Sequence, residues 1–324
     1  MKKTLHVQLF LAVLILGFLT GPHIIKALER LSPPSVPVET QTAAVVSATS
    51  TPQMVVKNPF ENLELYAKSA YVWDINARQK LYSLSGDASL PLASVTKIMT
   101  ALVATESFPS QTKITITPFD MLVEGDTGLS VGETWTLDKL IQFSLVASSN
   151  DGASAIAATL GGFMNAPTST DWVLNKTRFV EKMNEKARAI RLTQTTFQNE
   201  SGLDGEGGVS GAYGSARDMA MLFEYVFRKH PEIFSATAYP ELELRSEDNI
   251  MHRVANTNQD VTHIPGIIGS KTGYTDLAGG NLVIIVDIGI DHPVVIAVLG
   301  STRDGRFSDI LQLIAATIKA ITKN

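Results

Sequence analysis

Three short polar motifs stand out in this sequence because their residue types could together carry out nucleophilic catalysis. They are a Ser-x-x-Lys at 94–97, a Ser-Ser-Asn at 148–150 and a Lys-Thr-Gly at 271–273. A serine hydroxyl is a weak nucleophile near neutral pH, and a lysine can take its proton only if the amine is neutral. Burial and a second nearby cation both lower the pKa of a lysine. The pattern favours a nucleophile at Ser94, with Lys97 as its base and Lys271 as the second cation.

A second Ser-x-x-Lys, running from Ser110 to Lys113, shows how weak one such motif is alone. On composition, a chain of this size should contain on the order of one by chance. Ser110 leads into ITITP, a strand pattern, so its side chain and that of Lys113 would not share a helical face. The stretch ASVTKIMTALVATE has apolar residues at helical spacing, and residues three apart on a helix are neighbours. We therefore expect Lys97, and not Lys113, to reach the serine of its own motif.

Helices are predicted around the first two motifs. Ser94 falls at the first turn of a buried helix, because apolar residues follow it at helical spacing. The apolar face of LDKLIQFSLVA ends at residues 148–150, which predicts a helix-to-helix corner there. A further amphipathic helix is expected over 171–190. Ser215 and Asp218 resemble a capping box that opens another helix.

Strand patterns lie at both ends of the globular part. SAYVWDINARQKLYSL has two apolar stretches around residues 74–77, which predicts a hairpin. GGNLVIIVDIGI and HPVVIAVLG are β-branched runs separated by residues 289–292, and predict a second hairpin. FSDILQLIAATIKAIT closes the chain as an amphipathic helix. The pattern predicts an α/β fold, in which an antiparallel sheet built from both termini is flanked by helices and carries an inserted all-helical lobe.

Composition excludes several classes of function. The 324 residues are 44% hydrophobic and 18% charged with a formal net charge of -5, which suits a globular core and offers no basic stripe for nucleic acid. The absence of cysteine excludes disulfides and thiolate catalysis. The six histidines form no HExxH or other metal-ligand spacing, and there is no glycine-rich nucleotide motif. We expect no metal and no cofactor.

The N-terminus carries an export signal. Lys2 and Lys3 precede an apolar run over 5–21, which as a helix would span roughly 25 Å at about 1.5 Å per residue. No small-x-small cleavage site follows, so an uncleaved anchor is favoured over a cleaved signal peptide. We expect residues 1–30 to be this anchor or signal, 31–59 a Pro/Ser/Thr-rich linker, and 60–324 a catalytic domain on the outer side of the cell membrane.

The three motifs in this order resemble those of penicillin-binding proteins and serine β-lactamases. Longer stretches, among them PLASVTKIMTALVA, ASSNDGASAIA, FQNESGLDGEGG and IIGSKTGYTDLAGGNL, are similar to the low-molecular-weight penicillin-binding proteins of the serine-type D-alanyl-D-alanine carboxypeptidase family, peptidase family S11. The similarity covers roughly residues 60–318. It implies a β-lactamase/DD-peptidase-like fold.

The resemblance also implies catalytic roles. Ser94 would be the acylated nucleophile and Lys97 its general base. Ser148 would relay a proton to the leaving amine, and Asn150 would bind a substrate carbonyl and position Lys97. Asp151, which follows the triplet, is expected to cap the next helix.

The third motif would bind the substrate. By the resemblance, Lys271 and Thr272 lie on an edge strand and hold the terminal carboxylate of D-alanine, and Gly273 leaves room for the peptide alongside. Backbone N–H groups of Ser94 and Tyr274 would form the oxyanion hole.

The function that the resemblance implies is removal of the terminal D-alanine from peptidoglycan stem pentapeptides, with β-lactam antibiotics as covalent inhibitors. A DD-endopeptidase of peptidoglycan cross-links would use the same residues and stays open. A β-lactamase is disfavoured, because no Glu-x-x-x-Asn loop lies between the second and third motifs. A non-catalytic wall-binding protein is disfavoured because all three motifs are intact.

Overall fold

The computed structural model describes residues 58–125, 127–164 and 171–322. The predicted anchor over 1–30 and nearly all of the predicted linker lie outside the described residues. Within the described part, no helix is long and apolar enough to cross a membrane.

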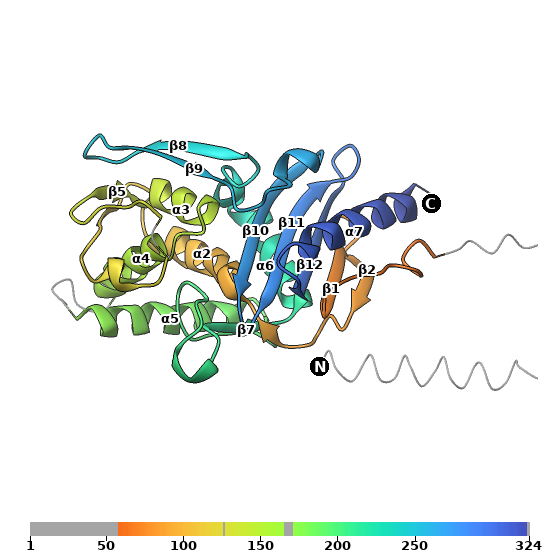
Figure 1. Cartoon of the computed structure of the whole chain (residues 1–324), viewed down its shortest axis with the longest axis horizontal. Coiled ribbons are helices and arrows are strands. Elements are labelled where there is room, and N and C mark those ends of the chain that lie inside the picture. The colour runs from red at the N-terminus through yellow and green to blue at the C-terminus, as the bar shows by residue number, and fades with distance from the viewer. Residues whose placement is uncertain (1–57, 126, 165–170, 323–324) are drawn as a thin grey trace, which may run out of the picture. The chain divides into compact units, whose positions relative to one another are not determined.

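A five-stranded antiparallel sheet forms the centre of the described part (Figure 1). Its strand order is β10-β11-β12-β1-β2, so strands from both ends of the chain lie side by side. The strands are β1 (Ser69–Asp74), β2 (Gln79–Leu84), β10 (Ile267–Thr275), β11 (Gly279–Asp287) and β12 (Pro293–Ser301). All nine residues of β12 are buried, as expected for a central strand covered on both faces. β10 is an edge strand.

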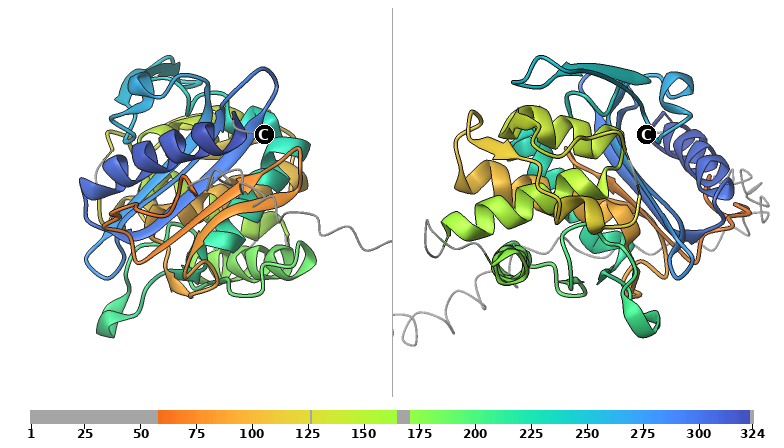
Figure 2. Two further views of the ribbon diagram at one scale, coloured as in Figure 1. Left: turned by 90° about the vertical axis from the view of Figure 1, so that its right-hand side faces the viewer. Right: turned by 60° about the vertical axis from the view of Figure 1, so that its left-hand side comes forward.

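Helices cover both faces of this sheet. On one face lies α7 (Gly305–Ile321), where apolar side chains such as Ile310 and Leu313 pack against Val72, Leu282 and Ile296. On the other face lie α6 (Ala216–Lys229) and the helical lobe, and the right-hand view of Figure 2 shows the sheet between the two layers. The α/β arrangement predicted from the sequence is confirmed.

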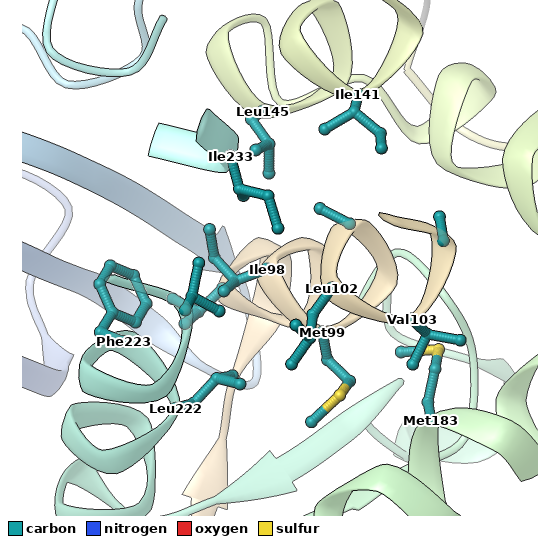
Figure 3. Close-up of a cluster of buried hydrophobic side chains, with 14 of the residues drawn as sticks. Ile98, Met99, Leu102, Val103, Ile141, Leu145, Met183, Leu222, Phe223 and Ile233 are labelled. Atoms are coloured by element: carbon teal, nitrogen blue, oxygen red, sulfur yellow. The ribbon is translucent and has the colours of Figure 1, made fainter. Parts of the chain in front are cut away.

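The helical lobe is built around α2 (Lys97–Ser107), whose first eight residues are all buried. Its other long helices are α3 (Leu137–Val146), α4 (Asn150–Phe163) and α5 (Trp172–Ala189). Figure 3 shows side chains of α2 such as Met99 and Leu102 among apolar residues of neighbouring helices. Because α2 is enclosed on most sides, residues at its start are fixed and removed from water.

Short elements complete the fold. β3 (Leu90–Pro91), β6 (Thr196–Phe197) and β7 (Ala212–Gly214) form a small sheet, β4 (Lys113–Thr115) pairs with β5 (Thr134–Thr136), and β8 (Glu241–Arg245) pairs with β9 (Met251–Ala255). The short 3-10 helices are η1 (Ala93–Thr96), η2 (Asp120–Leu122), η3 (Glu206–Gly208), η4 (Pro231–Phe234) and η5 (Val261–His263).

The predicted hairpins around 74–77 and 289–292 are confirmed as β1–β2 and β11–β12. The capping box is only half formed. The hydroxyl of Ser215 accepts a hydrogen bond from the backbone N–H of Asp218 at 3.0 Å. The carboxylate of Asp218 instead accepts from the backbone of Gln194 at 2.7 Å and from the hydroxyl of Thr195 at 2.8 Å. Tertiary donors therefore take the place of the local partner.

Candidate active site

Ser94 lies in the 3-10 turn η1, which leads directly into α2, and not in the α-helix itself. Ala93, just before it, has a φ of 47°, a backbone conformation that is uncommon for a residue with a side chain. Two glycines pack against this turn. A Cβ on Gly202 would lie 1.9 Å from the carbonyl oxygen of Ala93, and a Cβ on Gly273 would lie 2.8 Å from that of Leu92. The close backbone packing fixes the serine beside β10.

Lys97 begins α2 and is only 1% exposed. Its Nζ lies 2.9 Å from Ser94 Oγ, 2.7 Å from Asn150 Oδ1 and 3.0 Å from the carbonyl oxygen of Ser201. Burial lowers the pKa of Lys97 from its usual 10.5 to about 7, although nearby carboxylates oppose this. The amine can therefore exist in its neutral form near neutral pH.

The Ser-Ser-Asn triplet occupies the corner between α3 and α4, as predicted. Ser148 has a φ of 59°, which turns the chain sharply between the helices. Asn150 is held from both ends of its amide, since Oδ1 accepts from Lys97 and Nδ2 donates to the backbone carbonyl of Glu124 at 2.7 Å. The amide orientation therefore agrees with both of its partners.

The cap of α4 differs from the expectation. Ser149 is the N-cap, and its hydroxyl accepts from the backbone N–H of Gly152 at 2.9 Å. The prediction that Asp151 caps this helix is wrong, because the helix already begins at Asn150 and places Asp151 inside the first turn. A carboxylate there still lies near the positive end of the helix dipole.

The Lys-Thr-Gly triplet lies on the edge strand β10. Lys271 is 1% exposed, and its Nζ donates to Ser148 Oγ and to the carbonyl of Thr272, both at 2.9 Å. Burial and the nearby positive charges of Lys97 and Arg306 hold the pKa of Lys271 well below its usual value. The hydroxyl of Thr272 lies 2.6 Å from that of Thr257.

The structure brings polar side chains of all three motifs together in two groups. In one, Lys97 contacts Ser94 and Asn150, and in the other, Lys271 contacts Ser148. The Ser-Ser-Asn triplet joins the two groups, because it supplies both Ser148 and Asn150. Gly273 packs against the turn that carries Ser94. Tyr274 lies at the rim and is 44% exposed, and the Arg303 guanidinium carbon lies 5.3 Å from its ring centre. A hollow of about 380 Å³ opens beside them, lined by Glu124, Gly125, Asn150, Leu203, Asp204, Tyr274, Thr275 and Asp276.

Sequence reasoning missed two groups at this site. Arg306, on α7, donates to the carbonyl of Gly273 at 2.7 Å, and burial lowers the pKa of this arginine to about 10. Ser201 contributes its backbone carbonyl to Lys97. Neither carries a local signal, because one depends on the docking of a distant helix and the other is a main-chain group.

Ser110 and Lys113 lie elsewhere. Ser110 lines a larger hollow, of about 500 Å³, between α3, η4 and the end of α2, where apolar side chains such as Leu137, Ile141 and Ile233 alternate with polar ones. Lys113 begins β4, and its side chain is 52% exposed and forms an ion pair with Glu247. Within the described residues, no group of three or more His, Cys, Asp or Glu side chains could hold a metal ion.

The family profile described as D-alanyl-D-alanine carboxypeptidase matches residues 53–303 of this chain. The chain is 31% identical over 215 residues to D-alanyl-D-alanine carboxypeptidase DacF of Bacillus subtilis, covering 64% of this chain and 51% of the relative. It thus spans about half the length of that relative. Over 240 residues it is 30% identical to D-alanyl-D-alanine carboxypeptidase DacB2 of Mycobacterium tuberculosis, covering 74% of this chain and 77% of the relative.

Two further similarities bear on activity. A D-alanyl-D-alanine endopeptidase of Pseudomonas aeruginosa is 28% identical over 74% of this chain and 73% of its own length. Among solved structures, ampicillin-bound Penicillin-Binding Protein D2 of Listeria monocytogenes superposes with a TM-score of 0.64 at 25% identity, covering 79% of this chain and 98% of that one.

Proposed function

The chain belongs to the D-alanyl-D-alanine carboxypeptidase family of peptidases, and from that premise we propose that it is a serine-type enzyme that removes the terminal D-alanine from peptidoglycan stem pentapeptides. The observation that carries this proposal is the contact between Ser94 and the buried amine of Lys97. A serine becomes an effective nucleophile only beside a base that is neutral at the working pH.

The partners of Lys97 suit such a base. A neutral amine has two N–H donors and one lone pair. The donors are used by the side-chain oxygen of Asn150 and the carbonyl of Ser201, at 2.7 and 3.0 Å. The lone pair is then left for the hydroxyl of Ser94, 2.9 Å away.

Acylation follows from this arrangement. Ser94 Oγ bonds to the carbonyl carbon between the two D-alanines while its proton passes to Lys97. The developing negative charge on the carbonyl oxygen is stabilised by the backbone N–H groups of Ser94 and Tyr274. When the C–N bond breaks, Ser148 gives its hydroxyl proton to the departing amine of D-alanine and takes one in return from Lys271, whose Nζ lies 2.9 Å from its oxygen. Water then attacks the ester carbon, Ser94 recovers its proton from Lys97 as the ester bond breaks, and the proton released by the water returns to Lys271.

The terminal carboxylate of the substrate binds at the positive side of the site. Lys271 and Thr272 lie on the edge strand β10, where Lys271 Nζ contacts Ser148 Oγ, and the Arg306 guanidinium donates to the carbonyl of Gly273. Buried cations attract a carboxylate strongly because little water screens them. The enzyme should therefore require a free carboxylate at the end of the stem peptide.

Hydrolysis of defined muropeptides, followed by mass spectrometry, tests this proposal. A pentapeptide stem should lose one D-alanine and give a tetrapeptide, whereas the same stem with an amidated C-terminus should react poorly. The endopeptidase named among the relatives makes cross-link hydrolysis the second candidate. If cross-linked dimers are split while pentapeptide monomers survive, the endopeptidase function replaces the first.

Inhibition by β-lactams and location outside the membrane are part of the same proposal. A β-lactam resembles the D-alanyl-D-alanine amide and should leave a stable ester on Ser94, and the fold is shared with a protein solved with ampicillin bound. Lys2 and Lys3 before the apolar run over 5–21 support an N-terminal membrane anchor. An alkaline phosphatase fused after Asn324 should be active, and an inactive fusion would place the domain in the cytoplasm.

A further inference from the structure

A buried ion pair joins α5 to the loop that contacts Lys97. Lys176 Nζ lies 2.7 Å from Glu200 Oε1, with side chains 15% and 2% exposed. Burying two charges costs about as much desolvation free energy as their attraction returns, so a buried pair is weak evidence for a stabilising role. Its position beside the proposed catalytic base suggests another role.

The ammonium of Lys176 is held by several contacts. It lies 4.0 Å from the ring centre of Trp172 and 3.5 Å from Ser154 Oγ. Trp172 and Ser154 are themselves fixed, because both donate to one oxygen of the buried Asp120 carboxylate, at 2.9 and 3.0 Å. The cation is therefore kept at one place in the lobe.

Glu200 belongs to a tightly tied loop. Its backbone carbonyl accepts from the hydroxyl of Thr100 at 2.6 Å, and the next carbonyl, that of Ser201, accepts from Lys97 at 3.0 Å. Asn199 Oδ1 closes the turn by accepting from the backbone N–H of Gly202 at 2.7 Å. Because Glu200 and Ser201 are consecutive residues, an ion pair that fixes the side chain of Glu200 also restrains the Ser201 carbonyl that contacts Lys97.

The carboxylate also acts by charge. Its Oε2 is buried and has no hydrogen-bond partner among the described residues, so no donor screens the charge on this oxygen. Two carboxylates, of Glu200 and of Asp151 on α4, raise the pKa of Lys97 against the effect of burial. Opposite them lies the amine of Lys271 on β10, whose own pKa is lowered by burial and by the charges of Lys97 and Arg306.

We propose that Glu200 and Lys176 are a positioning pair for the catalytic lysine: Glu200 holds the Ser201 carbonyl on Lys97 and places a negative charge near its amine, and Lys176 partly neutralises that charge. The pair touches no reacting atom and acts through Lys97. It rests on the proposed serine mechanism.

The two members of the pair should shift the pH dependence of acylation in opposite directions. Glu200→Gln removes a negative charge near Lys97 and makes the protonated form of the Lys97 amine less favourable. The midpoint of the acidic limb of the pH–rate profile should therefore fall by about one pH unit. Removing the positive charge with Lys176→Met leaves Glu200 unopposed, so the midpoint should rise by a similar amount. Lys176→Arg keeps the charge and should restore the wild-type midpoint.

The test measures the acylation rate of the full chain by a fluorescent penicillin between pH 5 and 9, with melting curves to show that each variant is folded. Glu185→Gln removes the carboxylate of an exposed pair with Lys182 on the same helix and is the matched control, for which the wild-type midpoint is expected. Midpoints that move in opposite directions support the positioning pair.

If both variants lose rate at every pH but keep the wild-type midpoint, the pair is merely structural and the inference is overturned. The proposed function stands in that case, because the wild-type protein is still acylated. If the wild-type protein is not acylated at all, the serine mechanism fails and the positioning pair fails with it.

Discussion

The chain carries the Ser-x-x-Lys spacing twice, and the two copies have opposite surroundings. Lys97 is 1% exposed at the start of a helix, and its amine contacts Ser94 at 2.9 Å. Lys113 begins a short strand, and its side chain is 52% exposed and paired with Glu247. The two motifs have the same residue types at the same spacing, so the sequence pattern does not distinguish them. What distinguishes them is the burial of the lysine and its position on a helix.

The hollows near the two copies sharpen the contrast, because one is lined by Ser110 and the other by Asn150 and Tyr274. Ser110 lines the larger one, of about 500 Å³, and the cleft at Asn150 measures about 380 Å³. Size alone would therefore favour Ser110. The convergence of Lys97, Lys271 and Asn150 supports the proposal of Ser94 as the nucleophile, because an active site needs polar groups aimed at the reacting atoms.

The largest expected difference between the copies concerns the two lysines. Lys97→Ala should lower the rate of acylation by about three orders of magnitude or more, because nucleophile and base act as a unit. Lys113→Ala should leave the rate within a factor of about two, since its partner is a surface carboxylate. Stopped-flow measurements with a chromogenic β-lactam give both rates. Near-normal acylation by Lys97→Ala would rule out the Ser–Lys mechanism.

The backbone around Ser94 allows a second test of the contrast. Gly202 has a φ of 80° and its Cβ would lie 1.9 Å from the carbonyl oxygen of Ala93, whereas Gly207 has a φ of 73° and faces open space. Gly202→Ala should displace the turn and lower acylation by about a hundredfold, as small misplacements of catalytic groups do. Gly207→Ala carries only the backbone strain, of about 1 kcal/mol. Equal acylation by the two variants would mean that the turn is not held by this contact.

The pH dependence should follow the lowered pKa of Lys97. The amine is protonated below about pH 7 and neutral above it, so the rate of acylation should fall about tenfold for each unit below that value and level off above it. A base with the pKa of an ordinary solvent-exposed lysine would keep the rate rising to far higher pH. A profile still rising steeply at pH 9 would show that the base is not a lysine with a lowered pKa.

The smallest effect is expected from the surface pair of the second copy. Lys113→Met should lower the melting temperature slightly, and added salt should reduce the difference between variant and wild type, because exposed ion pairs are screened. The comparison uses melting curves at low and high salt. A large loss of stability that is insensitive to salt would mean that Lys113 has a packing role.

Local geometry made part of the site predictable. The contact between Ser94 and Lys97 follows from helical spacing, and the corner at Ser148 follows from the end of an apolar helical face. The contact of Lys271 with Ser148 joins residues far apart in the chain, and only the resemblance placed those two motifs in one cleft.

The remaining features of the site depend on tertiary packing, which the periodicity of apolar residues in the sequence does not predict. Arg306 reaches Gly273 because α7 docks on the sheet, and Ser201 acts through a carbonyl that any residue would supply. The cap of α4 is not predictable from residue type, because serine and aspartate are both good N-cap residues and only the observed start of the helix distinguishes Ser149 from Asp151. The α/β fold itself was predictable because strand and helix patterns alternate in blocks along the chain.

The most direct test of the central claim is to locate the ester that a penicillin leaves on the protein. Trypsin separates the two copies, because cleavage after Lys80, Lys97 and Lys113 places Ser94 in the peptide 81–97 and Ser110 in the peptide 98–113. After incubation of the full chain with penicillin, mass spectrometry should find the added mass on 81–97 alone, and Ser94→Ala should abolish it while Ser110→Ala does not. A penicilloyl group on 98–113, or one that persists in Ser94→Ala, would contradict the assignment of Ser94 as the nucleophile.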